Sequence, residues 1–147
     1  MENLNKAKTL IISIFGIIGS VAAHYLGGWD MALQTLVIFM AIDYFTGLIV
    51  AGVFHKSEKS DSGALESRAG WKGLCRKGMT LLIVLVATQL DKITGTEVIR
   101  DAAIIAYVVN ETISIIENAG LMGLPIPNII RKALDLLSKQ AEESEVK

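Results

Sequence analysis

The chain has 147 residues, a formal net charge of −1 and 52% hydrophobic residues. Soluble domains reach about 45–50% apolar content only when glycine is counted, and glycine is left out of the 52% here. The near-neutral charge gives no electrostatic support for a nucleic-acid partner, and the single cysteine, Cys75, rules out an intrachain disulfide or a cysteine-based zinc cluster. The composition favours an all-α membrane protein.

The first apolar segment covers residues 9–25, and Lys6 and Lys8 precede it. A basic start followed by an apolar run is also typical of a signal peptide. A second apolar run follows at once, however, so we expect an uncleaved first transmembrane helix that ends in a tight turn over residues 27–30.

Small residues of this first segment recur at intervals of three and four positions, which places them on one helical seam. A small seam lets transmembrane backbones approach closely, and such packing drives helix association in lipid. The seam either packs on the second helix of the same chain or joins subunits, and both alternatives stay open here. Its members are Ser13, Gly16, Ser20, Ala23 and Gly27.

The second apolar segment, residues 31–54, is long enough to cross a hydrocarbon core of about 30 Å at about 1.5 Å per residue. Asp43 lies midway along it, and Thr46 and Gly47 share its helical face. An acid at the bilayer centre costs about 2.5–3.5 kcal/mol on insertion scales. We therefore expect Asp43 to control assembly or line a pore; the alternative is an intrachain hydrogen bond to the third or fourth helix.

A basic loop is expected next, over residues 55–77. The third apolar segment, residues 79–90, is too short to span alone. It reaches spanning length if it includes residues 73–78, with Arg76 and Lys77 extending toward the membrane surface. The positive-inside rule places this loop, and with it the N-terminus, in the cytoplasm.

The fourth apolar segment, residues 102–119, carries a polar stripe. A lone helix of this kind sits poorly in lipid, so it needs partners, water or an interface. Whether it spans decides between three and four transmembrane helices, and it also decides the side on which the C-terminus lies. The stripe follows two overlapping helical faces, with Asn110, Ser114 and Glu117 on one and Glu111, Ser114 and Asn118 on the other.

Pro125 and Pro127 end the fourth segment, since proline lacks an N–H group and disfavours helix at the residue before it. Asn128 can then cap an amphipathic C-terminal helix that lies on the membrane or on a neighbouring subunit. We expect one membrane domain, residues 1–147, in four parts. These are a helical hairpin (1–54), the basic cytoplasmic loop (55–77), a second hydrophobic helix pair (78–119), and the proline break with the amphipathic helix (120–147).

No histidine or lysine lies in the same segments as the intramembrane carboxylates, so the sequence offers no acid–base pair for catalysis. There is no phosphate-binding loop and no nucleophile motif. His24 lies away from any metal-ligand pattern. The sequence therefore predicts no catalytic activity, no cofactor and no metal site.

Several motifs occur together in a characteristic order. The most specific runs from Asn110 to Pro127 and reads NETISIIENAGLMGLPIP. The others are Asp43, Thr46 and Gly47 in the second helix; Ser67, Gly70, Gly73, Arg76 and Lys77 before the third; and Asp91 after it. From about Asp43 to Leu137, the chain resembles the phage-lysis and toxin-secretion holin family, which includes the clostridial toxin-release holins.

This resemblance implies a multi-pass protein of the bacterial cytoplasmic membrane. Holins of this group form homo-oligomers and open lesions in the lipid bilayer, through which an endolysin or a toxin leaves the cytoplasm. The resemblance implies no direct binding between the holin and the endolysin or toxin. The alternative function is a small oligomeric ion or proton channel, or a transporter subunit. A membrane anchor or assembly factor is a third possibility, and a soluble helical bundle agrees least with the length of the second segment.

Overall fold

The computed structural model describes residues 1–145. Its regular secondary structure is all helical, and no strand occurs in these residues, which confirms the expected all-α fold with helices long and apolar enough to span a membrane. A short π-helical turn, η1 (Val50–Phe54), extends the second helix. The α-helices are α1 (Glu2–Tyr25), α2 (Met31–Ile49), α3 (Ser67–Thr94), α4 (Val98–Leu121) and α5 (Asn128–Glu145).

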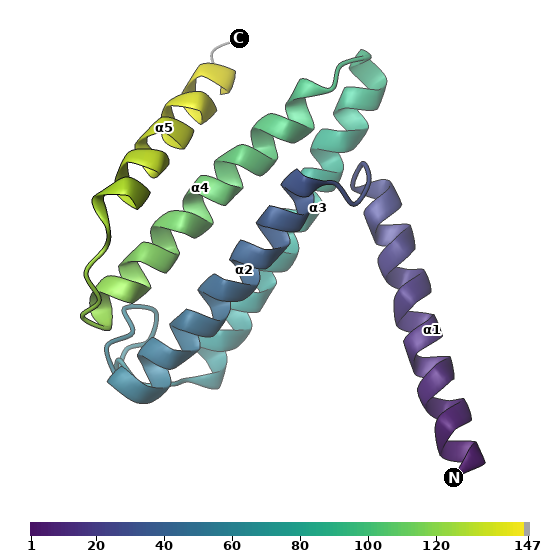
Figure 1. Cartoon of the computed structure of the whole chain (residues 1–147), viewed down its shortest axis with the longest axis horizontal. Helices are drawn as coiled ribbons and strands as arrows, with labels where there is room; N and C mark the ends of the chain where they lie inside the picture. Colours follow the sequence, from purple (N-terminus) through teal and green to yellow (C-terminus); the bar gives the residue numbers. More distant parts are fainter. Residues whose placement is uncertain (146–147) are drawn as a thin grey trace.

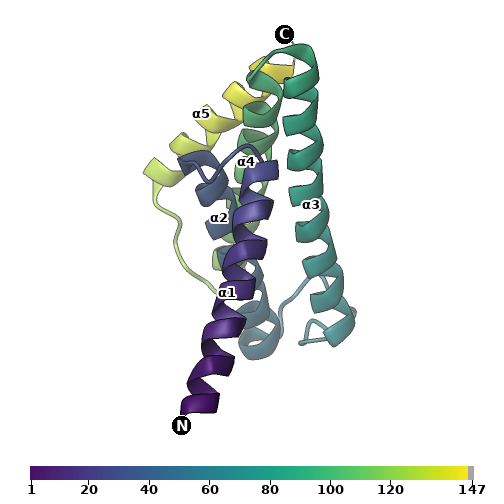
Figure 2. The same ribbon diagram turned by 90° about the vertical axis from the view of Figure 1, so that its right-hand side faces the viewer.

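Helices α2, α3 and α4 lie side by side as a three-helix bundle, with α3 antiparallel to the other two (Figures 1 and 2). We call the end that holds residues 26–30 and 95–97 the turn end, and the opposite end, which holds residues 55–66, the loop end. The core lies toward the turn end and consists of Leu26, Leu33, Leu36, Met40, Val84 and Ile104, each at most 8% exposed. Helix α5 runs along the outer side of α4.

Helix α1 stands away from the bundle (Figure 1). None of its residues is buried, and no neighbouring atom lies within 4 Å of a Cβ built on Gly16. Near its C-terminal end the Tyr25 carbonyl oxygen accepts a hydrogen bond from Gln89 Nε2 (3.5 Å). In this structure the small seam does not pack on the second helix, and its role in subunit assembly stays a prediction.

Three helical segments of the described chain are long and apolar enough to cross a membrane: α1, α2 together with η1 (Met31–Phe54), and α3. Helix α3 begins earlier than the sequence suggested. Its first residue is Ser67, so the basic loop covers residues 55–66 and not 55–77. The residue before the helix, Glu66, has extended backbone, and its Oε1 accepts a hydrogen bond from Ser62 Oγ (2.7 Å), which fixes the entry to α3.

The predicted helix break is present. Helix α4 ends at Leu121, Gly123 adopts a positive φ of 82°, and Pro125 and Pro127 lie in the connection to α5. The cap of α5 differs slightly from the prediction, because the Pro127 carbonyl oxygen accepts the first hydrogen bond, from Ile130 N (3.0 Å).

Candidate functional site

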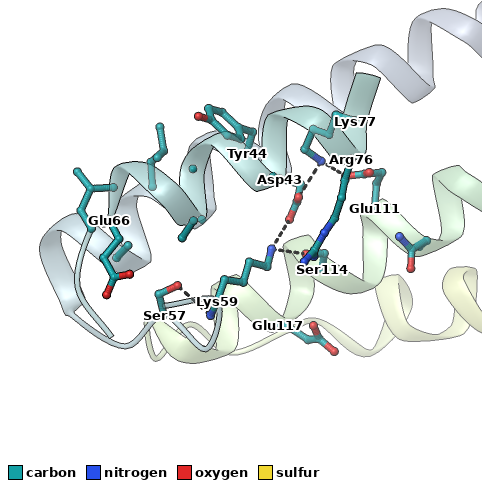
Figure 3. A pocket seen from close by; sticks show the side chains of 18 of the residues that line it. Asp43, Tyr44, Ser57, Lys59, Glu66, Arg76, Lys77, Glu111, Ser114 and Glu117 are labelled. Atoms are coloured by element: carbon teal, nitrogen blue, oxygen red, sulfur yellow. Dashed lines mark hydrogen bonds and ion pairs between the residues drawn. The ribbon is translucent and has the colours of Figure 1, made fainter. Parts of the chain in front are cut away.

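Three charged side chains from three different helices meet inside the bundle. Lys77 Nζ of α3 lies 2.8 Å from Asp43 Oδ2 of α2 and 2.5 Å from Glu111 Oε2 of α4 (Figure 3). Their side chains are only 13%, 8% and 7% exposed. We call Asp43, Lys77 and Glu111 the ionic triad. Because Lys77 of α3 pairs with a carboxylate on each of the other two helices, separating α3 from either α2 or α4 breaks an ion pair.

Three further candidates from the sequence lie beside the triad. Asn118 Nδ2 donates to Asp43 Oδ1 (3.2 Å) and to Thr46 Oγ1 (2.9 Å). Gly47 lies across from the same amide, since a Cβ built there would be 3.8 Å from Asn118 Nδ2. A methyl group at position 47 would be in ordinary van der Waals contact with this amide, so Gly47 faces α4 at this level. The intrachain alternative for Asp43, a hydrogen bond to the third or fourth helix, is thus realised in this subunit.

The loop supplies a fourth charge. Lys59 Nζ donates to Ser114 Oγ (3.3 Å) and lies 3.9 Å from Asp43 Oδ1, while its side chain stays 54% exposed. Two ammonium groups therefore face two carboxylates, and the cluster as a whole is neutral. Neutrality matters because an uncompensated charge is costly at membrane depth.

A cavity of about 450 Å³ opens beside the triad, between α2, α3, α4 and the loop. The other stripe residues, Asn110 and Glu117, line it and are exposed, as is Arg76. Neither Arg76 nor Glu117 forms an ion pair within the described chain. The two faces of the predicted stripe therefore separate: Glu111 and Asn118 point into the bundle, whereas Asn110 and Glu117 line a polar cavity.

A second ionic cluster closes the turn end of the bundle. The guanidinium of Arg100, on α4, donates from Nη1 to Asp30 Oδ2 (2.7 Å) and from Nη2 to Asp30 Oδ1 (3.1 Å), while its Nε donates to the Leu26 carbonyl oxygen (2.6 Å). We call this the outer clamp. The hydrogen bond from Arg100, together with one from Leu33 N, outweighs burial and lowers the pKa of Asp30 below its ordinary value. The clamp ties the α1–α2 turn to the start of α4.

The Asp91 carboxylate stabilises the start of α4. Its Oδ1 accepts from Thr96 Oγ1 (2.6 Å), and its Oδ2 accepts from Arg100 N (2.8 Å), so it serves as a cap for the first turn of α4. The sequence placed Asp91 after the third helix, but it lies within α3, which continues to Thr94. This aspartate joins the two antiparallel helices at the turn end.

Sequence reasoning missed Lys77, Lys59 and Arg100. The expectation that Lys77 extends toward the membrane surface is wrong, since its ammonium group points into the bundle. An antiparallel pairing of α2 with α3 would have indicated its role: Asp43 precedes Phe54 by 11 positions and Lys77 follows Ser67 by 10, so both lie at the same level.

Comparison with known proteins identifies the group to which the chain is related. A family model described as the bacteriophage holin family matches residues 20–139. An uncharacterized 14.9 kDa protein of Clostridium perfringens is 37% identical, over 95% of this chain and 99% of its own length. An uncharacterized protein of Listeria monocytogenes is 34% identical, over 93% and 94%.

A protein of Bacillus phage phi105 named as a probable holin is 32% identical, over 84% of this chain and 86% of its own length. No solved structure matches. The family match includes the ionic triad and the outer clamp, and it covers most of the chain. The chain therefore belongs to the bacteriophage holin family.

Proposed function

We propose that this protein is a holin of the bacterial cytoplasmic membrane, which oligomerises and opens lesions through which an endolysin or a toxin leaves the cell. Family membership and the probable holin of the phage relative support this function, and they favour a non-enzymatic role. Three membrane-capable helices support a multi-pass arrangement. The basic residues in the loop and in the first turns of α3 support a cytoplasmic loop end and a cytoplasmic N-terminus. They are Lys56, Lys59, Arg68, Lys72 and Arg76.

We further propose that α4 enters the membrane with α2 and α3. Its composition alone does not qualify it as a span, but it lies along α2 for most of its length (Figure 1). Its buried polar groups have partners in neighbouring helices: Glu111 pairs with Lys77, Asn118 with Asp43 and Thr46. Four spans return the C-terminal helix to the cytoplasmic side.

The observation that carries the mechanism is the ionic triad, because it joins all three helices of the bundle. While the triad is intact, a subunit pairs its own intramembrane charges and stays closed. When the helices separate, Asp43 and Glu111 need water or the polar groups of another subunit. A hydrated lumen shared by several subunits would supply both.

The membrane potential can bias this change. A charge that crosses the whole field gains or loses about 2.3 kcal/mol per 100 mV. In the closed subunit the cluster is neutral and couples weakly to the field. Separation of Lys77 from the two carboxylates creates net charges that can move in the field, so loss of the potential can shift the balance between closed and open subunits.

Lysis timing tests the proposal. The full chain is expressed in a bacterial host together with a cytoplasmic endolysin that has no secretion signal, and culture density is followed after induction. We expect abrupt lysis that needs both proteins, and we expect Asp43→Asn and Glu111→Gln to shift its onset. Ile38→Val, at an exposed apolar position of α2, serves as the control. If the endolysin stays in the cytoplasm, the holin function is wrong; if both polar variants lyse with wild-type timing, the triad does not govern opening.

A further inference from the structure

The polar and apolar parts of the bundle are arranged in layers along its axis. At the loop end lies the cavity of about 450 Å³, whose wall includes the triad carboxylates. Next comes a layer whose buried side chains are all apolar, with Tyr107 partly buried against it. The buried side chains are Leu33, Leu36, Met40, Val84 and Ile104, each 0–6% exposed. Beyond it, at the turn end, lies a second polar cavity of about 590 Å³, lined by Asp30, Asp91 and Arg100.

The apolar layer is thin compared with the bundle. Leu33 and Met40 bound it along α2, and the seven rises of about 1.5 Å between them make it about 10 Å thick. We call this layer the apolar plug. Two cavities that contain charged and hydroxyl groups favour water, while an apolar constriction excludes it. This arrangement is that of a pathway closed at one point.

From these layers we propose that the bundle of a single subunit is a gated pathway for protons. A hydrated vestibule leads from the cytoplasmic loop end to Asp43 and Glu111 near the middle of the membrane. The apolar plug blocks the remaining distance to the outer cavity. This activity rests on the proposed membrane placement of α4, but it does not require lesion formation.

The carboxylates of the triad place proton-binding groups at the inner end of the vestibule. Carboxylates can accept and release protons, and Lys59 and Ser114 extend the polar wall toward the cytoplasm. With water on both sides of the plug, most of the membrane potential falls across about 10 Å of apolar side chains. The plug is therefore the position at which the field acts most strongly.

Cysteine labelling tests whether water enters as proposed. Cys75 is first replaced by serine, and cysteines are then introduced singly as Ser114→Cys and Leu36→Cys in the full chain in lipid vesicles. A water-soluble, positively charged methanethiosulfonate reagent should label position 114 rapidly and leave position 36 unlabelled. Slow labelling at position 114 would contradict a hydrated vestibule. Labelling at position 36 as fast as at position 114 would contradict an apolar plug that excludes water.

Proton flux tests the pathway itself. The full chain is reconstituted at low density into phosphatidylcholine and phosphatidylglycerol vesicles that contain a pH-sensitive dye and a large labelled dextran. Leu36→Ser should raise the rate of proton entry about tenfold over wild type, a barrier lowered by ~1.4 kcal/mol, while the dextran is retained. Ile38→Ser is the matched control, because Ile38 is 54% exposed and lies outside the plug.

Val84→Thr keeps the shape of the side chain while adding a hydroxyl, and it should raise proton entry in the same direction even if Leu36→Ser does not fold. If neither variant exceeds the Ile38→Ser control, the proton pathway is wrong. Dextran release at high density with no proton effect at low density would overturn this inference and leave the holin function intact. Proton entry without dextran release under any condition would support the proton pathway and overturn the holin function.

Discussion

Replacing Lys77 with methionine gives the most direct test of the ionic triad. Methionine preserves much of the length of the lysine side chain, so the variant removes the ammonium group with little change in packing. Asp43 and Glu111 then face each other without a cation between them, and Lys59 is the remaining nearby ammonium group, 3.9 Å from Asp43 Oδ1. We expect the bundle to be less stable and the closed subunit to open more readily.

The structure sets the size of this effect. Both carboxylates are less than a tenth exposed, and breaking a buried ion pair by removing one partner costs about 3–5 kcal/mol. We therefore expect a loss of ~4 kcal/mol.

Unfolding by sodium dodecyl sulfate in mixed detergent micelles, followed by circular dichroism, measures this loss. The comparison that separates charge from packing is the triple variant Asp43→Asn, Lys77→Met, Glu111→Gln. Neutral replacement of a whole buried ionic group is often close to neutral in stability, so the triple variant should recover most of the loss. A wild-type midpoint for Lys77→Met would refute the role of the triad. A triple variant no better than the single one would assign the loss to packing.

Three further predictions concern other parts of the molecule. The hydrogen bond from Arg100 lowers the pKa of Asp30. The outer clamp therefore stabilises the fold above about pH 4, where an aspartate of ordinary pKa is ionised. This stabilisation is lost as the pH falls through the lowered pKa of Asp30. Thermal unfolding in detergent between pH 7 and 3 should show that loss for the wild type and not for Asp30→Asn. Gly27→Ala should destabilise the fold by about 1–3 kcal/mol through backbone strain at φ +91°, and further because the new Cβ would lie 2.6 Å from Arg100 Nε. Gly28→Ala, at φ +106° with no atom within 4 Å of its Cβ, has the strain without the clash. Equal thermal unfolding midpoints for the two variants would contradict the clash. Gly16→Leu should reduce the size of cross-linked oligomers in detergent, whereas Ala22→Leu, on the side of the helix away from the seam, should not.

The helices were predictable because their signals are local. Apolar runs of spanning length, the proline pair after α4 and the spacing of the stripe all lie within single segments, and the structure confirms the all-α fold they predicted. The start of α3 was harder to locate. Residues 67–77 are rich in glycine and charge, and their helical state depends on packing beside α2 and α4 and not on their own composition.

The composition of the site could not be predicted because it depends on how helices face one another. Asp43 and Glu111 were recognised as costly in lipid, but their partner lies on a third helix, and no spacing along the chain links it to either carboxylate. The outer clamp is similarly non-local, since Arg100 joins residues 70 or more positions away. Such contacts require the order and direction of the helices first.

The pairing of charges within one subunit has a consequence for assembly. In the proposed mechanism, a subunit that already pairs Asp43, Lys77 and Glu111 has no electrostatic need for a neighbour, so it can accumulate closed in the membrane. Within the described chain, the stripe residues without an ion pair or side-chain hydrogen bond are Asn110 and Glu117, which line the cavity. Changes to the triad should therefore alter when subunits open, whereas changes to Asn110 and Glu117 should alter what open subunits form. In this view the two faces of one helix separate the timing of lysis from the construction of the lesion.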